Sequence, residues 1–354
     1  MKFPVISFEQ PIGTLLLTIM SVPQLIKISK ADPRKYDAIS METIGGIQRE
    51  PSSKRIIEIA RYAETVDATF PTPILLALEE GTYELDGDFL IIKEEKVADI
   101  VDGQHRVLGL GKSGVDENFI IPVVFLLNVT EEQKALIFAT INGKQTKVPA
   151  SLIYDLFGVT KTRSPQKTAH EIARALNSTS SSPWHRRLKM LGKKTPGSTE
   201  SLSQGTFVKF LLPHISSDPV NDMDVLKRGK TPRPRNQCIF NEYFLNEQDS
   251  VILKILMNVF KAVQQTWPDE WENPNISILT KTTGFAGIMK ALPVLVGKGK
   301  SERNLSLEYF AKIFYTVREE LERKNIRLTS DDFPPSASSE HELQKIIENI
   351  AGKI

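Results

Sequence analysis

Short runs of apolar residues separated by Gly, Pro and Asp mark the first half of the chain. The runs at 71–78, 89–92 and 119–127 have the length and the bounding residues that are typical of strands. Residues 14–20 and 25–28 carry further apolar patterns, which predict either opening strands or one strand and a short helix. The first half is therefore expected to contain a β-sheet.

Two segments of the first half have helical periodicity instead. Residues 54–64 follow Ser52-Ser53, and either serine can cap a helix. The buried side of this helix is expected to contain Ile56, Ile57, Ala60 and Tyr62. A second helix is expected to begin at a capping box made by Thr130 and Gln133 and to end at 142–143. Its expected apolar face contains Leu136, Ile137 and Ala139.

After residue 158 the strand-like runs almost disappear, and amphipathic segments follow one another between stretches rich in Pro, Gly and Ser. The segments expected to be helices are 166–176, 205–215, 250–266, 284–296, 306–323 and 340–350. The aromatic residues expected in their core are Phe207, Phe210, Phe260, Phe285, Phe310 and Phe314. This change of pattern predicts an α+β protein with a mixed-sheet domain at 1–157 and a helical domain at 158–354.

Residues 97–110, VADIVDGQHRVLGL, combine a strand, a tight turn and the start of a helix. The backbone N–H groups of a first helical turn have no partner within the helix and can bind phosphate. Gly103 allows a ligand to approach closely, and His105 and Arg106 add donors. Asp102 can hold a ribose hydroxyl, a metal or a cation. The same residues also fit an ordinary turn at which His105 and Arg106 only cover a helix end.

Two further polar segments offer donors for a phosphate or a base. Gln48 and Arg49 lie on a loop before the helix expected at 54–64. The second segment lies at the end of the helix that Thr130 opens, and it contains Asn142, Lys144, Gln145 and Lys147. Each segment can equally be a solvated loop without a ligand.

The net charge of +2 hides an uneven distribution. Residues 159–235 contain 15 Lys and Arg against 5 Asp and Glu, a net charge of +10, which leaves −8 for the other residues (30 basic against 38 acidic). Such a basic segment either is a solvated surface or binds the phosphates of nucleic acid with little sequence preference. Together with Lys144 and Lys147, the residues expected to contact DNA are Arg186, Arg187, Lys189, Lys193, Lys194, Lys227, Arg228, Lys230, Arg233 and Arg235.

The composition excludes several other classes of protein. Cys238 is the only cysteine, so the chain has no intramolecular disulfide and no multi-cysteine zinc site, and we expect a buried bystander thiol. No apolar run reaches the roughly 20 residues that a membrane span needs. The N-terminus lacks the pattern of a signal peptide. These features predict a cytoplasmic protein that does not bind membranes, and no residues are predicted to bind a metal.

Residues 102–106 (DGQHR), followed by Gly109, resemble the signature of the DGQHR-domain proteins, which include the DndB component of bacterial DNA phosphorothioation systems. These proteins are distantly similar to ParB and sulfiredoxin. Further matches lie at 46–49 (Gly-x-Gln-Arg), at 138–142 (Phe-x-x-x-Asn), at Gln145 and, more loosely, at 279–285. The resemblance covers about residues 40–157.

The resemblance implies a ParB/sulfiredoxin-like domain that binds a nucleotide at the turn. Gln104 stands where sulfiredoxin has its cysteine, which argues against sulfinyl reduction and leaves Gln104 to orient a water or a base edge. Asp102 would position a metal or water, and Arg106 would stabilise charge on a transferred phosphoryl group. The candidate catalytic residues are Asp102, Gln104, His105 and Arg106. The candidate nucleotide-binding residues are Gln48, Arg49, Gly103, His105, Arg106, Asn142 and Gln145.

We therefore expect a nucleotide-dependent, DNA-binding component of a bacterial DNA-modification or defence system. The resemblance implies ATP or another nucleoside triphosphate, with Mg²⁺ as a candidate companion, and it leaves ATPase activity open. Expected partners are double-stranded DNA and other DNA-modification proteins, and a homo-oligomer is compatible with the resemblance. Two alternatives remain: a non-catalytic transcriptional regulator, and a DNA-nicking nuclease, which would need more clustered carboxylates than Asp99, Asp102 and Asp116.

Overall fold

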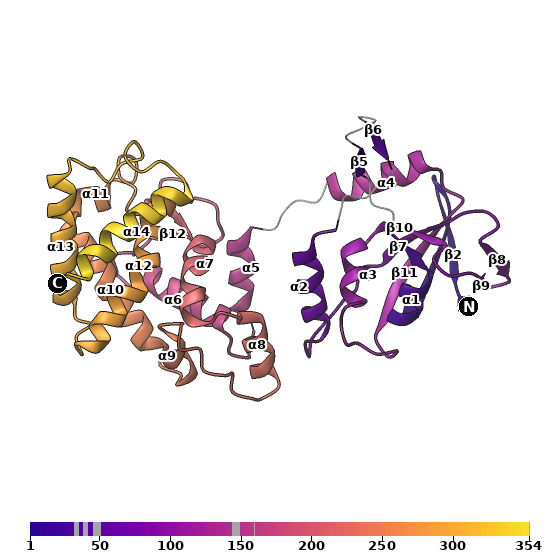
Figure 1. The fold of residues 1–354 in the computed structure, drawn as a ribbon, viewed down its shortest axis with the longest axis horizontal. Coiled ribbons are helices and arrows are strands. Elements are labelled where there is room, and N and C mark those ends of the chain that lie inside the picture. The colour runs from indigo at the N-terminus through magenta and orange to yellow at the C-terminus, as the bar shows by residue number, and fades with distance from the viewer. Residues whose placement is uncertain (32–34, 38–41, 45–50, 144–148, 159, 354) are drawn as a thin grey trace. The chain divides into compact units, whose positions relative to one another are not determined.

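The computed structural model describes residues 1–31, 35–37, 42–44, 51–143, 149–158 and 160–353. Contacts divide the chain into a first unit, residues 1–146, and a second unit, residues 147–354 (Figure 1). The first unit contains the mixed sheet and most of the second unit is helical, which confirms the predicted α+β class. The division falls after residue 146 rather than after 157 because α5 (Ala150–Phe157) packs on α6 (Pro165–Ser178) and α7 (Gln204–Ile215).

A six-stranded mixed sheet forms the centre of the first unit. Its strands, in order across the sheet, are β2 (Ile6–Gln10), β3 (Gly13–Ser21), β11 (Ile120–Leu127), β7 (Ile74–Leu78), β10 (Ala98–Asp102) and β4 (Ser29–Lys30). β11 and β7 are parallel, as are β10 and β4, and the other neighbours are antiparallel. A smaller antiparallel sheet contains β1 (Lys2–Pro4), β9 (Phe89–Ile92) and β8 (Tyr83–Asp86), and β5 (Lys35–Asp37) pairs with β6 (Glu42–Ile44).

Four helices accompany these strands in the described part of the first unit. They are α1 (Val22–Ile28), α2 (Ser53–Ala63), α3 (Gln104–Leu110) and α4 (Glu131–Gly143). Leu25 of α1 and Val107 of α3 pack in one core with one face of the sheet, and Ile137 of α4 packs against the other face. Because α2 packs on α3, it forms an outer layer beside the predicted turn (Figure 1).

The helix α2 begins where the sequence predicts, but its buried face is different. Ser52 is the N-cap and accepts a hydrogen bond from the backbone N–H of Arg55. Ile56 and Ala63 are buried, whereas Ile57 is 48% and Tyr62 is 37% exposed, so the prediction that these two are buried is wrong. Ile56, with Ile59 and Ala60, faces inward because positions three and four apart share one side of a helix.

The capping box of α4 is present, and the predicted apolar face of this helix is only partly correct. Thr130 and Gln133 exchange hydrogen bonds between their backbone N–H groups and side chains, at 2.8 and 3.2 Å. Ile137 faces the sheet, but Leu136 is 63% exposed and Ala139 is also exposed. Among residues 131–141 of this helix, the buried one is Lys134, whose side chain is only 3% exposed.

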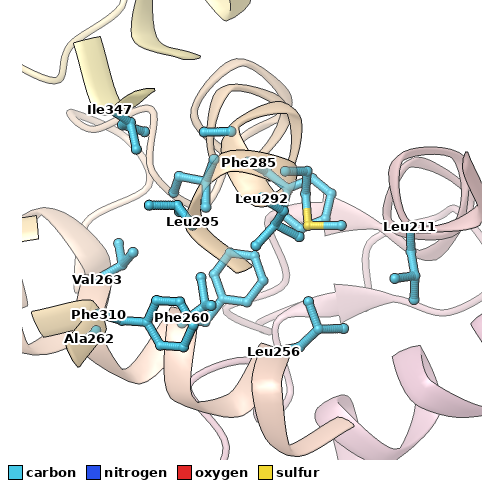
Figure 2. Close-up of a cluster of buried hydrophobic side chains, with 14 of the residues drawn as sticks. Leu211, Leu256, Phe260, Ala262, Val263, Phe285, Leu292, Leu295, Phe310 and Ile347 are labelled. Atoms are coloured by element: carbon cyan, nitrogen blue, oxygen red, sulfur yellow. The ribbon is translucent and has the colours of Figure 1, made fainter. Parts of the chain in front are cut away.

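The second unit is a set of packed helices around one large core. Besides α5, α6 and α7 its helices are α8 (Pro219–Lys227), α9 (Asn241–Leu245), α10 (Asp249–Thr266), α11 (Pro268–Glu272), α12 (Thr282–Ser301), α13 (Leu307–Arg323) and α14 (Ala337–Ala351). A short parallel pair, β12 (Leu188–Lys189) and β13 (Leu202–Ser203), joins them. Figure 2 shows Phe260, Phe285 and Phe310 among the aliphatic side chains of this core. Five of the six predicted core phenylalanines are fully buried, and Phe210 packs against them.

The long helices of the second unit lie where the sequence predicts them, and the four short helices α5, α8, α9 and α11 were not predicted. Cys238 is a buried free thiol, as expected, and burial raises its pKa. Among the helices of the described residues, none combines the length and the apolar character that a membrane crossing needs.

Candidate functional site

The predicted strand, turn and helix at 97–110 are confirmed as β10, Gly103 and α3. Gly103 has a φ of 100°, in the left-handed region that glycine adopts without strain. A Cβ atom at this position would lie 2.5 Å from Cδ1 of Ile74 and 3.1 Å from Nη2 of Arg106. Both the backbone conformation and the close packing of Ile74 therefore require glycine at the turn.

Arg106 holds the turn against the segment that precedes β7. Its Nη1 donates to the carbonyl oxygen of Thr72 at 2.7 Å and to Oγ1 of Thr72 at 2.8 Å. Its Nη2 donates to the carbonyl oxygen of Pro73 at 3.2 Å and to Oδ2 of Asp102 at 3.0 Å. The side chains of Arg106 and Asp102 are only 20% and 26% exposed. Two of the predicted catalytic residues thus form an ion pair that fixes the local fold.

His105 connects the turn to α2. Its Nε2 accepts a hydrogen bond from the backbone N–H of Ser52 at 2.9 Å. A ring nitrogen that accepts a hydrogen bond carries no proton, so His105 is neutral in this arrangement. Because Ser52 is the N-cap of α2, His105 fixes the position at which that helix begins.

Gln104 is the first residue of α3 and is buried, with 6% of its surface exposed. Its Nε2 has no hydrogen-bond partner among the residues that the structure describes. Among the described residues of the first unit, no other buried side-chain nitrogen or oxygen lacks a partner. An unpaired buried donor costs about 1–3 kcal/mol of folding free energy. Such a cost is expected where a ligand supplies the missing acceptor.

The other predicted nucleotide contacts belong to segments around residues 48 and 142. Gln48, Arg49 and Gln145, and the DNA candidates Lys144 and Lys147, lie outside the described residues. Asn142 belongs to the last turn of α4, and its side chain also lies outside the description. The turn of residues 102–106 is therefore the part of the predicted site that the structure describes.

Three carboxylates gather on the face of the sheet that α4 covers. Oxygens of Glu79, Asp99 and Glu131 lie within 4.8 Å of one another. The ammonium of Lys134 lies among them, 2.8 Å from Asp99, 2.7 Å from Glu131 and 3.5 Å from Glu79. The ammonium of Lys134 occupies the position between the carboxylates that a metal ion would take, and it balances part of their negative charge.

The charges in this cluster shift the pKa values of half-buried Asp99 and buried Lys134. Burial raises the pKa of Asp99, but the hydrogen bonds and charges of Lys134 and Lys30 outweigh burial and hold this pKa below its ordinary value. Burial lowers the pKa of Lys134, and its bonds to Asp99 and Glu131 outweigh that effect and raise it. Asp99 and Lys134 are therefore both ionised at neutral pH.

Two of the arginines predicted to contact DNA serve the fold of the second unit. Arg187 is 7% exposed, donates to the carbonyl oxygen of Trp271 and forms an ion pair with Glu272. Arg235 donates through Nε and Nη2 to the two carboxylate oxygens of Asp222, which is fully buried. Truncating either arginine would leave its partner without a counter-charge.

The remaining predicted DNA contacts differ in their surroundings. Arg228 is exposed and pairs with Asp224, one helical turn before it, and Lys227 is half-buried at the end of α8. Exposed cations for whose side chains no partner is found within the described residues are Arg186, Lys193, Lys194, Lys230 and Arg233, and half-buried Lys189 has none there either. They form two groups, one around β12 and one after α8, and Figure 1 draws these two elements apart from each other within the second unit.

Sequence reasoning missed the partners that hold the turn. Thr72 and Pro73 precede β7, and Ser52 precedes α2, so they lie 34, 33 and 53 residues from the side chains that they contact. Only the antiparallel pairing of β7 with β10 brings the first two beside Arg106. A single sequence carries no signal for that pairing.

Comparison with known proteins supports the resemblance stated above. The family model of DndB, described as DNA-sulfur modification-associated, matches residues 3–190, more than half of the 354-residue chain. No curated protein and no solved structure matches the chain. The expected likeness to the ParB and sulfiredoxin folds therefore stays a prediction.

Proposed function

Because the chain belongs to the DndB family of DNA-sulfur modification-associated proteins, we propose that it is a DNA-binding component of such a system whose turn at 102–106 binds a nucleotide. The nucleotide is ATP or another nucleoside triphosphate. Its binding would change how the second unit holds DNA. Hydrolysis of the nucleotide is a further part of this proposal, and release of phosphate would measure it.

The observation that carries the nucleotide proposal is the unpaired Nε2 of Gln104. The helix α3 has only seven residues, so its dipole alone does not make a phosphate site. Gln104 adds a buried donor immediately after Gly103, at the first residue of α3. A phosphate oxygen or an acceptor on a base would satisfy this donor. Mg²⁺, if it accompanies the nucleotide, would supply charge neutralisation on the phosphates.

The DNA part of the proposal rests on the exposed cations that the fold does not use. Arg186, Lys193 and Lys194 belong to one connected stretch around β12, and their side chains have no ion pair within the described residues. Exposed cations of this kind neutralise backbone phosphates and give affinity that falls with salt. Arg187 and Arg235 are left out of this set because Arg187 is itself buried and pairs with Glu272, and Arg235 pairs with the fully buried Asp222.

The experiment that tests the nucleotide site is a calorimetric titration of ATP, GTP and CTP into the wild type and into Gln104→Met. Methionine keeps the approximate volume of glutamine and removes the donor. We expect affinity for the bound nucleotide to fall about tenfold, which is about 1.4 kcal/mol. The melting temperature should stay equal or rise, because an unsatisfied buried amide is removed.

Gln166→Met is the matched control for this experiment. Gln166 is also 6% exposed and has an unpartnered buried oxygen, but it lies on α6 in the second unit. This variant should bind nucleotide like the wild type. Equal nucleotide affinity in Gln104→Met and in the wild type would show that Gln104 is not part of a nucleotide site.

One observation favours a second candidate, a DNA-binding regulator that uses the turn only structurally. Arg106 and His105 both form hydrogen bonds within the protein, so a structural role accounts for these two residues without a ligand. This candidate predicts DNA binding that no nucleotide changes. A DNA-nicking activity is not proposed, because Asp99 and Asp102 pair with Lys134 and Arg106, and Asp116 accepts from Asn118.

A further inference from the structure

Asp102 is the only anionic partner of Arg106 among the described residues. The other acceptors on this guanidinium are neutral oxygens of Thr72 and Pro73. The neutral bonds fix the guanidinium in place, and the bond between Nη2 and Oδ2 of Asp102, 3.0 Å long, balances its charge. The pair therefore has no net charge when both side chains are ionised.

This neutrality has a consequence for any anion at the turn. A phosphate close enough to use Arg106 would also face the carboxylate of Asp102, the last residue of β10, four positions before Arg106. Two negative charges about 4 Å apart repel each other by about 1 kcal/mol in water and by about 4 kcal/mol near a protein surface. Because both side chains are mostly buried, solvent screens this repulsion only in part.

We propose that Asp102 occupies the phosphate position on Arg106 in the ligand-free protein and that the phosphate of a bound ligand displaces it. The inference rests on the proposed binding of a phosphate ligand at residues 102–106. Thr72 and Pro73 keep the guanidinium in place during the exchange, since neutral acceptors do not compete with an anion for its charge. Asp102 thus weakens binding and sets the ligand concentration at which the turn is occupied.

The chemistry identifies the ligand as a phosphate group, which can belong to a nucleotide or to the backbone of DNA. The two sources differ in what accompanies the phosphate. Inorganic tripolyphosphate and ATP present a chain of phosphates, whereas a short DNA duplex presents single diesters. Titrations with these three probes therefore distinguish the sources.

The test is to titrate tripolyphosphate, ATP and a DNA duplex into the wild type and into Asp102→Asn. Asparagine keeps the shape of aspartate and can still accept from Nη2, but it carries no charge. We expect the variant to bind the true ligand class at least about fivefold more tightly, the fold-change that corresponds to about 1 kcal/mol. The melting temperature should fall slightly because the ion pair is lost.

Asp88→Asn is the matched control, since Asp88 is exposed in the turn between β8 and β9 and no partner of its side chain is found within the described residues. It changes the net charge equally and should leave each affinity unchanged. The double variant Asp102→Asn/Arg106→Gln should not bind the ligand more tightly than the wild type, because the guanidinium that Asp102→Asn releases is then absent. Ligand affinity in the double variant as high as in Asp102→Asn would overturn the proposed exchange of Asp102 for phosphate.

The outcomes separate this inference from the proposed function. Equal or weaker binding by Asp102→Asn, with nucleotide still bound in a Gln104-dependent manner, overturns the exchange and leaves the nucleotide proposal intact. Absence of binding by the wild type and by Asp102→Asn for all three probes overturns both. Tighter binding of only the duplex supports the exchange and assigns the turn to DNA.

Discussion

Gly103 determines the geometry of the turn through two separate effects. Its φ of 100° is strained for any residue with a Cβ atom, and the space beside it is filled by Ile74. The positions of Asp102 and Gln104 beside the proposed ligand depend on this backbone conformation. In the DGQHR signature, the glycine is therefore required by the backbone conformation, and its neighbours Asp102 and Gln104 carry the polar groups of the candidate site.

Gly103→Ala should destabilise the first unit by about 2–4 kcal/mol, the sum of backbone strain and of the clash with Ile74. Gly81→Ala is the matched control, because Gly81 has a φ of 86° but nothing lies within 4 Å of its Cβ position. It should show the strain alone, about 1 kcal/mol. Urea unfolding followed by circular dichroism measures both variants. If both variants lose the same free energy of unfolding, the clash with Ile74 does not contribute to the effect of Gly103→Ala.

The DGQHR signature and its strand-turn-helix setting could be predicted from sequence, because they depend on neighbouring residues. The bonds of Arg106 to Thr72 and of His105 to Ser52 could not, since each joins residues more than 30 positions apart. The sequence predicted phosphate contacts for both side chains. Whether they also contact a ligand stays a prediction, and the structure adds a local role for each.

At the scale of elements, Lys134 attaches α4 to the sheet. Its ammonium pairs with Asp99 of β10 and with Glu131 of its own helix. An amphipathic pattern could not predict this contact, because an ionic residue takes the inward position that the pattern assigns to an apolar one. The capping box of α4 could be predicted because it needs only Thr130 and Gln133, which are close in sequence.

Lys134→Met should lower the free energy of unfolding of the first unit by about 2 kcal/mol at pH 7. The figure lies below the ~3–5 kcal/mol of a fully buried pair because Glu79 and Glu131 are mostly exposed. The control Lys93→Met removes an exposed pair with Glu84 and should cost about 0.5 kcal/mol or less. Tryptophan fluorescence gives an internal control, since Trp184, Trp267 and Trp271 all lie in the second unit.

The difference in free energy of unfolding between the wild type and Lys134→Met depends on pH in a definite direction. The pKa of Asp99 is lowered in the folded protein, so its stabilisation is present above the unfolded pKa, about 3.9, and is lost as the pH falls through the folded value. The pKa of Lys134 is raised, so its stabilisation is complete below about pH 10.4 and is lost only as the pH rises through the folded value. The difference between wild type and variant should therefore be constant from about pH 5 to 9 and shrink in acid. A difference that grows below pH 4 would contradict this ion pair.

At the scale of the whole molecule, sequence predicted two kinds of domain and a regional basic surplus. Sequence could not separate the structural arginines from the exposed ones, because the ion-pair partners of Arg187 and Arg235 lie 85 and 13 residues away in the chain. Arg186 and Arg187 are adjacent, yet one is exposed and the other is buried against Glu272. Net charge along the sequence therefore overstates the cationic surface that DNA can reach.

The proposed nucleotide site lies in the first unit and the exposed cations proposed to bind DNA lie in the second, so coupling between nucleotide and DNA is the central claim. Two variants, compared with the wild type, test the DNA part and the nucleotide part of this claim separately. The triple variant Arg186→Gln/Lys193→Gln/Lys194→Gln should weaken DNA binding with and without nucleotide and lower the salt slope of the affinity by up to about 2.7. Gln104→Met should keep the DNA affinity of the nucleotide-free protein and lose any response to ATP.

The most direct test is the affinity of the wild type for a fluorescent DNA duplex, measured by anisotropy at several salt concentrations with and without saturating ATP. The account predicts that ATP changes the dissociation constant at least about threefold, a coupling of about 0.7 kcal/mol, and that Gln104→Met abolishes the change. The same dissociation constant and salt slope in both conditions would contradict the account and favour a regulator that binds DNA without a nucleotide.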